Sequence, residues 1–443
     1  MKDESARPEW FYTAPCEQVM VRRGDPLGFR RTADWYADLL APGLSNRTFD
    51  ARWLTILLWI LHQANSVWQR FFDGESLDTA EAARRFYEWV KPLELLWVAR
   101  TAIHFDPSGR QLPGIQAIKR WLAAKRNLPQ FGLSPDQYRR YRQASVYGAY
   151  RVMLREVGSL TRANDGFRPH PKCQQLIDLV DRYVPKIPLP KHLRGRMRDP
   201  ARYWTGVSHA WDKLRAAKLF PTTRRERPSR LTPEERQVLF PAIFGDSSED
   251  SRRRCHVAQI IGKSRAKNHT QLCVALAGRL DDKGVDVLPH FSRLADAGVD
   301  AMDAVWKALS DDPKKRVSQL SKQIEVVEKL QLLSEAARSW KKLGHTGLEG
   351  ESVVQSLADA ACGARTGEKS LLALVQHHEQ YGGGLHWFKL TGNNSYLVQI
   401  APQGLTESSR YRFRLYALGR LAVQCGVIRQ LPLALGYTPD EEE

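Results

Sequence analysis

The chain has 443 residues, of which 42% are hydrophobic and 26% charged, so its composition excludes a wholly disordered protein and predicts about two to four folded domains. The N-terminal residues are charged where a signal peptide needs an apolar run, and the most hydrophobic stretch, residues 53–61, is about half of the roughly 20 residues that a membrane span requires. The formal net charge of +18 indicates an acidic or polyanionic partner, and we expect a cytoplasmic protein with no membrane partner.

Residues 1–109 are expected to form a helical domain that is rich in tryptophan, with 7 of the 13 tryptophans of the chain. The spacing of apolar residues predicts helices over residues 32–40, 50–70 and 79–104. Pro42 and Gly43 separate the first helix from the second. Because tryptophan side chains need buried or interfacial positions, this part of the chain predicts a substantial core.

The positive charge is concentrated between residues 110 and 230. This segment contains 27 Lys and Arg against 8 Asp and Glu, whereas the other 322 residues contain 40 basic and 41 acidic residues. A charge as localised as this creates a local field and indicates a polyanionic partner. Eight carboxylates cannot neutralise the segment by local pairing. Two alternatives stay open: a solvated face, and arginines that pair with acidic residues elsewhere in the protein.

Within this basic segment the cations form three clusters, two of which lie beside Tyr and Trp residues. Arginine dominates the clusters, and its planar guanidinium suits phosphate oxygens and stacks on bases. The aromatic rings would add stacking platforms for a single strand. We therefore predict nucleic-acid binding, with DNA favoured, by the following residues: Arg139, Arg140, Arg142, Lys191, Arg194, Arg196, Arg198, Arg202, Arg224, Arg225, Arg227 and Arg230.

The secondary structure of the basic segment is expected to be helical with a long basic loop. Helices are predicted over residues 114–125, 135–157, 173–183 and 200–218. The prolines of residues 184–200 prevent a regular helix and favour an extended loop. Helix, loop, helix and an Arg-rich tail together are compatible with a winged-helix-like element.

The remaining chain divides into a helical domain, residues 231–344, and a small α+β domain, residues 345–443. Thr232 followed by Pro and two Glu is typical of a helix start. Apolar residues at three- and four-residue steps over residues 317–340 predict one long, core-facing helix, with a coiled-coil seam as the alternative. Alternating apolar runs over residues 386–390 and 396–400 predict a hairpin, and a helix over residues 409–425 is expected to end at Gly426. The fold class is therefore mainly α with a short C-terminal hairpin.

No motif of the chain predicts a catalytic, metal or cofactor site. Residues 363–370 have P-loop spacing, but Glu368 stands in place of the second glycine and would repel phosphate. Two histidines at 377–378 and a third at 386 favour a bend before the hairpin over a metal site. Six cysteines without any C-x-x-C pair are expected to be buried thiols in a reducing compartment.

A diverged nuclease is not excluded by these absences. Arg100 and His104, and likewise Arg252 and His256, lie one helical turn apart, one residue short of a ribonuclease pattern of Arg, four residues and His. No carboxylate of the chain can be assigned to a metal-dependent cleavage.

Residues 25–61 resemble the opening of an uncharacterised group of bacterial proteins often encoded within anti-phage defence clusters. The resemblance is carried by Leu40, Pro42, Gly43, Ser45, Arg47, Thr48, Arg52 and Trp59, with a weaker likeness at residues 381–388. It covers about a tenth of the chain and implies a bacterial host and a multi-protein defence system, without a mechanism. Arg47 and Arg52 are open to two interpretations, phosphate contacts or helix-end caps.

The sequence thus predicts a non-catalytic, nucleic-acid-binding subunit of a bacterial assembly, in which the flanking helical regions dock other protein subunits. An adaptor that binds an acidic protein face and a nuclease are the alternatives.

Overall fold

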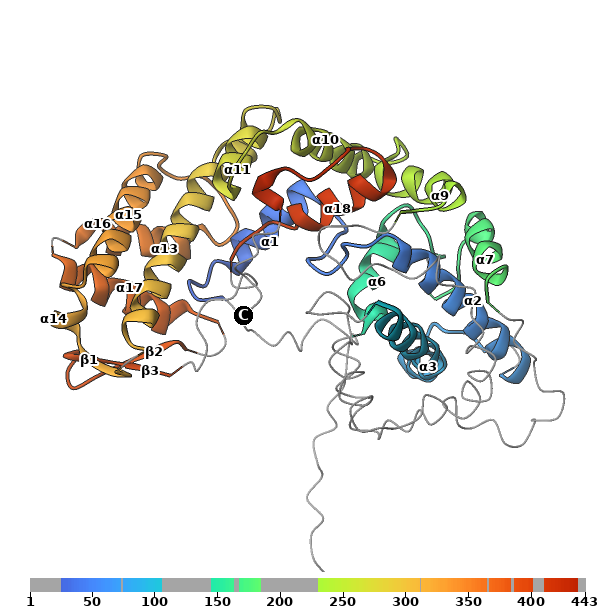
Figure 1. The fold of residues 1–443 in the computed structure, drawn as a ribbon, viewed down its shortest axis with the longest axis horizontal. Helices are drawn as coiled ribbons and strands as arrows, with labels where there is room; N and C mark the ends of the chain where they lie inside the picture. The colour runs from blue at the N-terminus through green and yellow to red at the C-terminus, as the bar shows by residue number, and fades with distance from the viewer. Residues whose placement is uncertain are drawn as a thin grey trace, which may run out of the picture. The chain divides into compact units, whose positions relative to one another are not determined.

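The computed structural model describes residues 25–72, 75–105, 145–162, 167–184, 230–310, 312–364, 366–383, 386–400 and 410–436. These residues form helices joined by turns, with a small three-stranded antiparallel sheet, so the predicted mainly-α class is confirmed (Figure 1). Within the described residues no helix is long and apolar enough to span a membrane.

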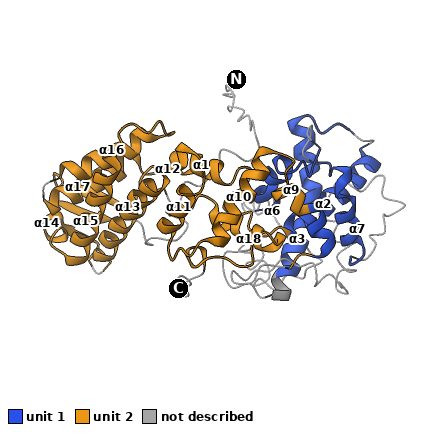
Figure 2. Ribbon diagram, turned by 90° about the horizontal axis from the view of Figure 1, so that it is seen from above, with its two compact units in different colours: residues 1–20, 52–224, 232–238 blue, residues 21–51, 225–231, 239–443 orange. Residues whose placement is uncertain are grey.

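The chain divides into two compact units, which are described separately here (Figure 2). Unit 1 contains residues 1–20, 52–224 and 232–238, and unit 2 contains residues 21–51, 225–231 and 239–443. This grouping differs from the four-part division expected from the sequence. The reason is that helix α1 packs against α10, more than 200 residues further along the chain, instead of joining the tryptophan-rich helices.

Unit 1 is built around the apolar helix α2. Its described helices are α2 (Arg52–Phe71), α3 (Ala80–Phe105), α6 (Val146–Glu156), the short 3-10 helix η1 (Pro171–Cys173) and α7 (Gln174–Asp181). Helix α2 contacts α3, α6 and α7, and it is buried over most of its length. Trp59 packs edge-on against Trp97 with ring centroids 6.2 Å apart, and its indole Nε1 donates to Asp181 Oδ1 at 2.7 Å. The tryptophan-rich segment therefore forms a core, as expected.

A buried ion pair joins the start of α2 to residues 232–235 of the same unit. Glu235 accepts from Arg52 Nη2 at 2.8 Å and from Thr55 Oγ1 at 3.0 Å, and Arg52 and Glu235 are almost completely buried. Glu235 also closes a capping box, because Thr232 Oγ1 accepts from the Glu235 backbone N–H and the Glu235 carboxylate accepts from the Thr232 N–H. The charge of Arg52 is thus matched by Glu235 inside the unit.

Unit 2 consists mostly of antiparallel and crossing helices. They are α1 (Arg30–Leu40), α10 (Glu249–Lys263), α11 (His269–Ala277), α12 (Lys283–Asp286), α13 (Leu288–Ala308), α14 (Val317–Leu320), α15 (Ile324–Lys341), α16 (Glu351–Gly363), α17 (Gly367–Tyr381), α18 (Leu415–Cys425) and the 3-10 helix η5 (Leu433–Leu435). Helix α9 (Pro233–Phe244) belongs to unit 1 up to residue 238 and to unit 2 from residue 239. Helix α13 packs against α11 and α15, and α15 packs against α16.

The sheet of unit 2 has the strand order β1-β3-β2. Its strands are β1 (Lys314–Arg316), β2 (Phe388–Thr391) and β3 (Tyr396–Gln399). The predicted hairpin is confirmed as β2 and β3, whose turn contains Gly392, Asn393 and Asn394, all with positive φ. Strand β1 was not predicted, because its three residues, Lys-Lys-Arg, carry no apolar alternation.

Most predicted helices lie close to the observed ones. Helices α1, α2 and α3 begin and end within two residues of the predicted ranges. The predicted helix over residues 135–157 is wrong as a continuous element, because Ser145 has extended backbone angles and caps α6 by accepting from the Gly148 N–H. The helices predicted over residues 114–125 and 200–218, and most of the winged-helix-like element, lie outside the described residues.

Two C-terminal predictions need correction. The apolar pattern over residues 317–340 belongs to two helices, α14 and α15, separated by a turn at residues 321–323. Its core-facing orientation is correct for Leu330 and Trp340, whereas Ile324 is 76% exposed. Helix α18 ends at Gly426 as predicted, but it begins at Leu415, because Phe413 and Arg414 have positive φ and cannot continue a helix.

The two segments that carry the sequence resemblance meet in one place, which we call the junction (residues 25–29 with residues 377–383 and 386–388). Asp25 forms an isolated antiparallel bridge with Gly383. Gly28 has a φ of +72°, and a Cβ at this position would lie 2.5 Å from the Tyr381 carbonyl oxygen. Only glycine combines this backbone angle with so close an approach. The likeness at residues 381–388 therefore packs against the first residues of the segment 25–61, within unit 2.

Candidate nucleic-acid interface

Eleven of the twelve predicted nucleic-acid-binding residues, all except Arg230, lie outside the described residues. Arg230 lies in an exposed stretch of irregular backbone just before α9. For the eleven, binding therefore stays a prediction from charge and residue type.

The described part of the basic segment is also positively charged. It holds seven Lys and Arg against three Asp and Glu, and most of these cations are exposed. Some are already bound: Arg182 pairs with Glu234 at 3.1 Å, and Lys172 donates to the Gly158 carbonyl oxygen. Arg155 and Arg162 are exposed on and after α6. The excess charge of the segment thus continues into the stretches that the structure places.

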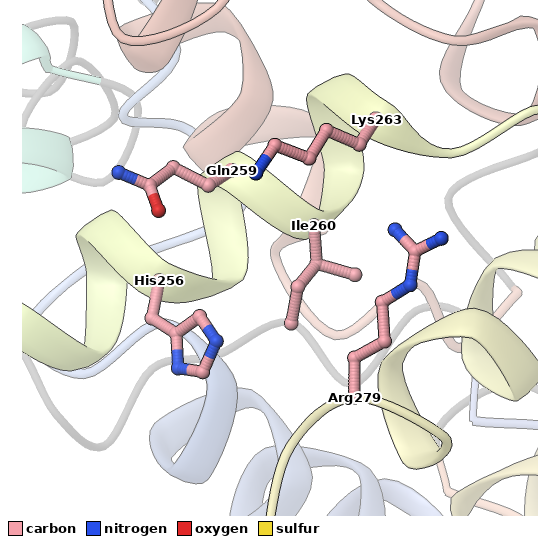
Figure 3. Close-up of a pocket in the computed structure, with 5 residues that line it drawn as sticks. All are labelled: His256, Gln259, Ile260, Lys263 and Arg279. Carbon is pink, nitrogen blue, oxygen red and sulfur yellow. The ribbon is translucent and has the colours of Figure 1, made fainter.

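A second cationic surface lies in unit 2, on α10. His256, Gln259, Ile260 and Lys263 follow one another at helical spacing, which places them on one face of the helix. Together with Arg279, which follows α11, they line a shallow hollow of about 300 Å³, called here the α10 hollow (Figure 3). Ile260 is buried at its floor, and the other four side chains are exposed.

Contacts on the inner face of α10 determine which side of this helix is exposed. Arg254 is 1% exposed and donates to three oxygens: Ile243 O at 2.8 Å, Pro42 O at 2.9 Å and Ser251 Oγ at 3.1 Å. Burial lowers the pKa of its guanidinium to about 10. Arg253 donates to Leu39 O and pairs with Asp282. Because these two arginines are hydrogen-bonded on one side of α10, the opposite side of the helix faces solvent.

The electrostatics of the α10 hollow suit an anion. None of its five lining residues is acidic, and among the described residues no ion pair engages Lys263 or Arg279. Arg279 offers a planar fork and Lys263 a compact ammonium, the two cationic groups that proteins use for phosphate oxygens. Gln259 and His256 add two further polar side chains at the edge. The hollow can therefore hold a phosphate group while leaving the rest of a ligand in solvent.

A buried cluster of nucleophile-like residues lies elsewhere in unit 2. His269 Nδ1 is 3.1 Å from Ser292 Oγ and 3.8 Å from Cys273 Sγ. These three side chains are at most 5% exposed. Burial lowers the pKa of His269 to about 3 and raises that of Cys273 to about 12, so the thiol stays protonated at neutral pH. The cluster stabilises the core and gives no access to a substrate.

The histidines of the junction are also occupied. His377 Nε2 donates to Leu27 O at 2.9 Å, and His378 bridges two backbone groups, donating to Pro26 O at 2.7 Å and accepting from the Trp387 N–H at 2.9 Å. Burial lowers the pKa of each histidine to about 4, which keeps the rings neutral. Across the described stretches, no group of His, Cys, Asp and Glu side chains is arranged to hold a metal ion.

Sequence reasoning noticed part of the α10 hollow and missed the rest. It singled out Arg252 and His256, one turn apart, as a weak nuclease-like pair. Extending that spacing by seven residues would have reached Lys263. Arg279 carries no such signal, because it joins the hollow only through the packing of α10 against α11.

The residues that carry the resemblance are mostly structural. The Thr48 hydroxyl closes a turn by accepting from the Ser45 N–H and donating to the Ser45 carbonyl oxygen. Leu40 and Trp59 are buried, and the Pro42 carbonyl oxygen accepts from Arg254. No protein-family model, no curated protein and no solved structure matches this chain.

Proposed function

We propose that this protein is a non-catalytic nucleic-acid-binding subunit of a multi-protein bacterial assembly, with DNA as the favoured ligand. The observation that carries the proposal is the confinement of the charge excess to residues 110–230, with 27 basic and 8 acidic residues. Arginine-rich clusters of this kind neutralise phosphates and release counterions, which gives largely sequence-independent binding. The resemblance of residues 25–61 extends the proposal to a defence system that includes other protein subunits.

The α10 hollow supports the same ligand class. It lies outside the basic segment, yet exposed cationic side chains line a space large enough for a phosphate group. A protein that only needed solubility would gain nothing from such a hollow. Each surface offers cations for phosphate, so variants of either one should lower the affinity for a polyanion.

The proposal is tested by binding of the purified protein to labelled duplex DNA, single-stranded DNA and RNA over a salt series. We expect log Kd to rise linearly with log salt, with a slope set by the number of phosphates contacted. Changing Arg194, Arg196 and Arg198 to Glu should abolish most of the binding and flatten the slope by about three units, at roughly one unit per cation.

The matched control reverses three exposed cations that lie outside both surfaces, namely Lys322, Arg338 and Lys342. This control changes the net charge by the same amount and should leave the salt slope unchanged. Equal loss in both variants would mean that the overall charge, and not the basic segment, determines binding. Unchanged affinity of the Arg194, Arg196 and Arg198 variant would contradict the placement of the contact surface.

Two other outcomes would replace the proposal. If the protein binds no nucleic acid even at low salt but captures a purified acidic protein domain, the basic segment is a docking surface of an adaptor. If magnesium-dependent cleavage of the labelled strands accompanies binding, the protein is a nuclease.

A further inference from the structure

The outer face of the small sheet in unit 2 combines cations with an aromatic ring. Residues directly opposite each other in an antiparallel sheet share a face, and the register places Lys314, Val398 and Lys389 in one row and Arg316, Tyr396 and Thr391 in the next. We call these six residues the outer sheet face. Lys314, Arg316 and Lys389 are exposed, and Tyr396 is half-buried on the middle strand, beside the hairpin turn.

The opposite face of the sheet is covered by helices. Leu397 and Phe388 are buried, and Lys315 reaches across to donate to the Ala308 carbonyl oxygen at the end of α13. Helix α14 contacts β1 and α17 contacts β2, so the three strands lie against one end of the helical group (Figure 1). This packing fixes which face looks outward and holds the strands in register.

Two cations of β1 lie against the ring of Tyr396. The Lys314 ammonium lies 5.0 Å from the centre of its ring and the Arg316 guanidinium carbon 5.7 Å, and Arg316 Nε donates to the Tyr396 hydroxyl at 3.1 Å. The eleven residues of the three strands include four Lys and Arg and no Asp or Glu. The acidic side chains next to the sheet accept from its backbone: Asp312 from the Lys314 N–H and Glu379 from the Leu390 N–H.

Lysine on edge strands also discourages pairing between sheets of different molecules, and this role accounts for cations on β1 and β2. It does not account for a tyrosine held among them on the central strand. A ring flanked by flexible cations is the arrangement that binds single-stranded nucleic acid, since each base can stack on the ring while the adjacent phosphates meet Lys and Arg. In a duplex, the base faces are already stacked on their neighbours and cannot reach the ring.

We propose that the outer sheet face binds single-stranded nucleic acid, with one base stacked on Tyr396 and the flanking phosphates bound by Lys314, Arg316 and Lys389. This proposal rests on the proposed function in one respect only, the ligand class; the surface and its selectivity for single strands are new. The cations leave the ring when phosphate arrives, at little cost, because an exposed cation–π contact is weak compared with a charge-assisted hydrogen bond to phosphate.

The test compares three ligands of equal length: oligo-deoxythymidine, the same strand without bases, and a duplex. The variant Tyr396→Leu removes the ring and keeps every charge. We expect it to weaken binding of oligo-deoxythymidine about tenfold, the usual loss for one stacked base, and to leave binding of the abasic strand and the duplex unchanged. Tyr396→Phe keeps the ring, so it should bind oligo-deoxythymidine like the wild-type protein.

Two controls separate this proposal from the general one. Phe240→Leu removes an aromatic ring that is 39% exposed on α9 and should change no affinity. Lys389→Glu should weaken both single strands, with and without bases, because it acts on phosphate.

The outcomes are distinguishable. If the wild-type protein binds none of the three ligands, the proposed function fails. If it binds them but Tyr396→Leu binds oligo-deoxythymidine as tightly as wild type does, the proposed function stands and the outer sheet face is not a single-strand site. Equal weakening of all three ligands by Tyr396→Leu would also overturn the proposal, since that pattern reports a disturbed sheet and not a lost stack.

Discussion

Two regions of unit 2 use basic side chains in opposite ways. The first is the interior, where Arg254, His377 and His378 each donate to backbone carbonyl oxygens and are almost completely buried. The second is the α10 hollow, whose cations are exposed and, among the described residues, form no ion pair. Arg254 and Lys263 lie on the same helix, so the difference is set by what each side of α10 packs against.

The comparison teaches that a count of charges does not locate a binding surface. A buried cation must be matched by acceptors, because an unmatched one costs several kcal/mol. Arg254 is matched in this way, and the two buried histidines stay neutral, so these interior side chains are part of the fold and unavailable to a ligand. Those of the hollow keep their capacity for an external anion. Variants of the two regions should accordingly differ in which property they change: stability for the first, affinity for the second.

The largest effect is expected from Arg254→Met, which removes the donor to two buried carbonyl oxygens and to Ser251. Each of the three acceptors that lose their donor costs about 1–3 kcal/mol, so we expect the free energy of unfolding to fall by at least about 3 kcal/mol. Urea denaturation followed by circular dichroism measures this change. The neighbouring Arg252→Met is the control, because Arg252 is exposed and donates to a single backbone oxygen, Asp246 O. A loss below about 1 kcal/mol in Arg254→Met would show that the carbonyls find other donors.

The next effect concerns Gly28, which positions the carbonyl groups that His377 and His378 bind. Gly28→Ala places a methyl group 2.5 Å from the Tyr381 carbonyl oxygen at a φ of +72°, and we expect a loss of about 3 kcal/mol. Gly347→Ala is a matched control, because Gly347 has the same φ and no atom within 4 Å of the added carbon. It should cost only about 1 kcal/mol, the strain of the backbone angle. Equal melting temperatures for the two variants would mean that the junction yields without loss.

The resemblance segments illustrate what a sequence can and cannot predict. The helices over residues 30–105 and the hairpin could be predicted, because each follows from apolar periodicity or turn residues within a short window. The meeting of Gly28 with Tyr381 could not, since nothing in either window refers to a segment about 350 residues away. Strand β1 was missed for a related reason: Lys314, Lys315 and Arg316 become a strand only by pairing with β3.

The same limit applies to the candidate sites. The charge excess of the basic segment is visible in the sequence, because charge adds up along the chain. The α10 hollow and the outer sheet face are visible only in three dimensions, where Arg279 joins α10 and Tyr396 comes to lie between Lys314 and Arg316. Nor could the sequence predict that Arg254 is buried while Arg252 is exposed, because burial depends on how α10 packs against other helices.

A smaller effect is expected from pH. The pKa of His377 is lowered to about 4 by burial, whereas an unfolded chain titrates near pH 6.5, so the unfolded state binds a proton first as the pH falls. The contribution of His377 to the free energy of unfolding is fully present above pH 6.5 and is lost as the pH falls towards 4. His377→Gln keeps a donor for Leu27 O without a titrating group. Between pH 7 and pH 5.5 the free energy of unfolding of His377→Gln should therefore fall by about 1 kcal/mol less than that of the wild-type protein.

Denaturation at several pH values measures the difference between the two proteins. Asp25 acts in the opposite direction, because burial raises its pKa, so its contribution falls as the pH rises above 3.8. Asp25 and His378 are present in both proteins, so most of their contributions cancel in the comparison. Parallel stability curves for the two proteins would show that His377 is protonated in the folded state.

The smallest effect on stability, and the sharpest contrast with Arg254, is expected at the α10 hollow. Changing Lys263 and Arg279 to Glu replaces two exposed side chains, so the free energy of unfolding should change by less than about 0.5 kcal/mol per substitution. Nucleic-acid affinity should fall at least about tenfold at low salt, and the slope of log Kd against log salt should flatten by about two units. Reversal of Arg338 and Lys342, two exposed cations on and just after α15, is the matched control for net charge. If the hollow variant and this control bind nucleic acid equally well, the exposed cations of α10 are only a solvated face. The difference between buried, paired cations and exposed, unpaired ones would then predict effects on stability but not on binding.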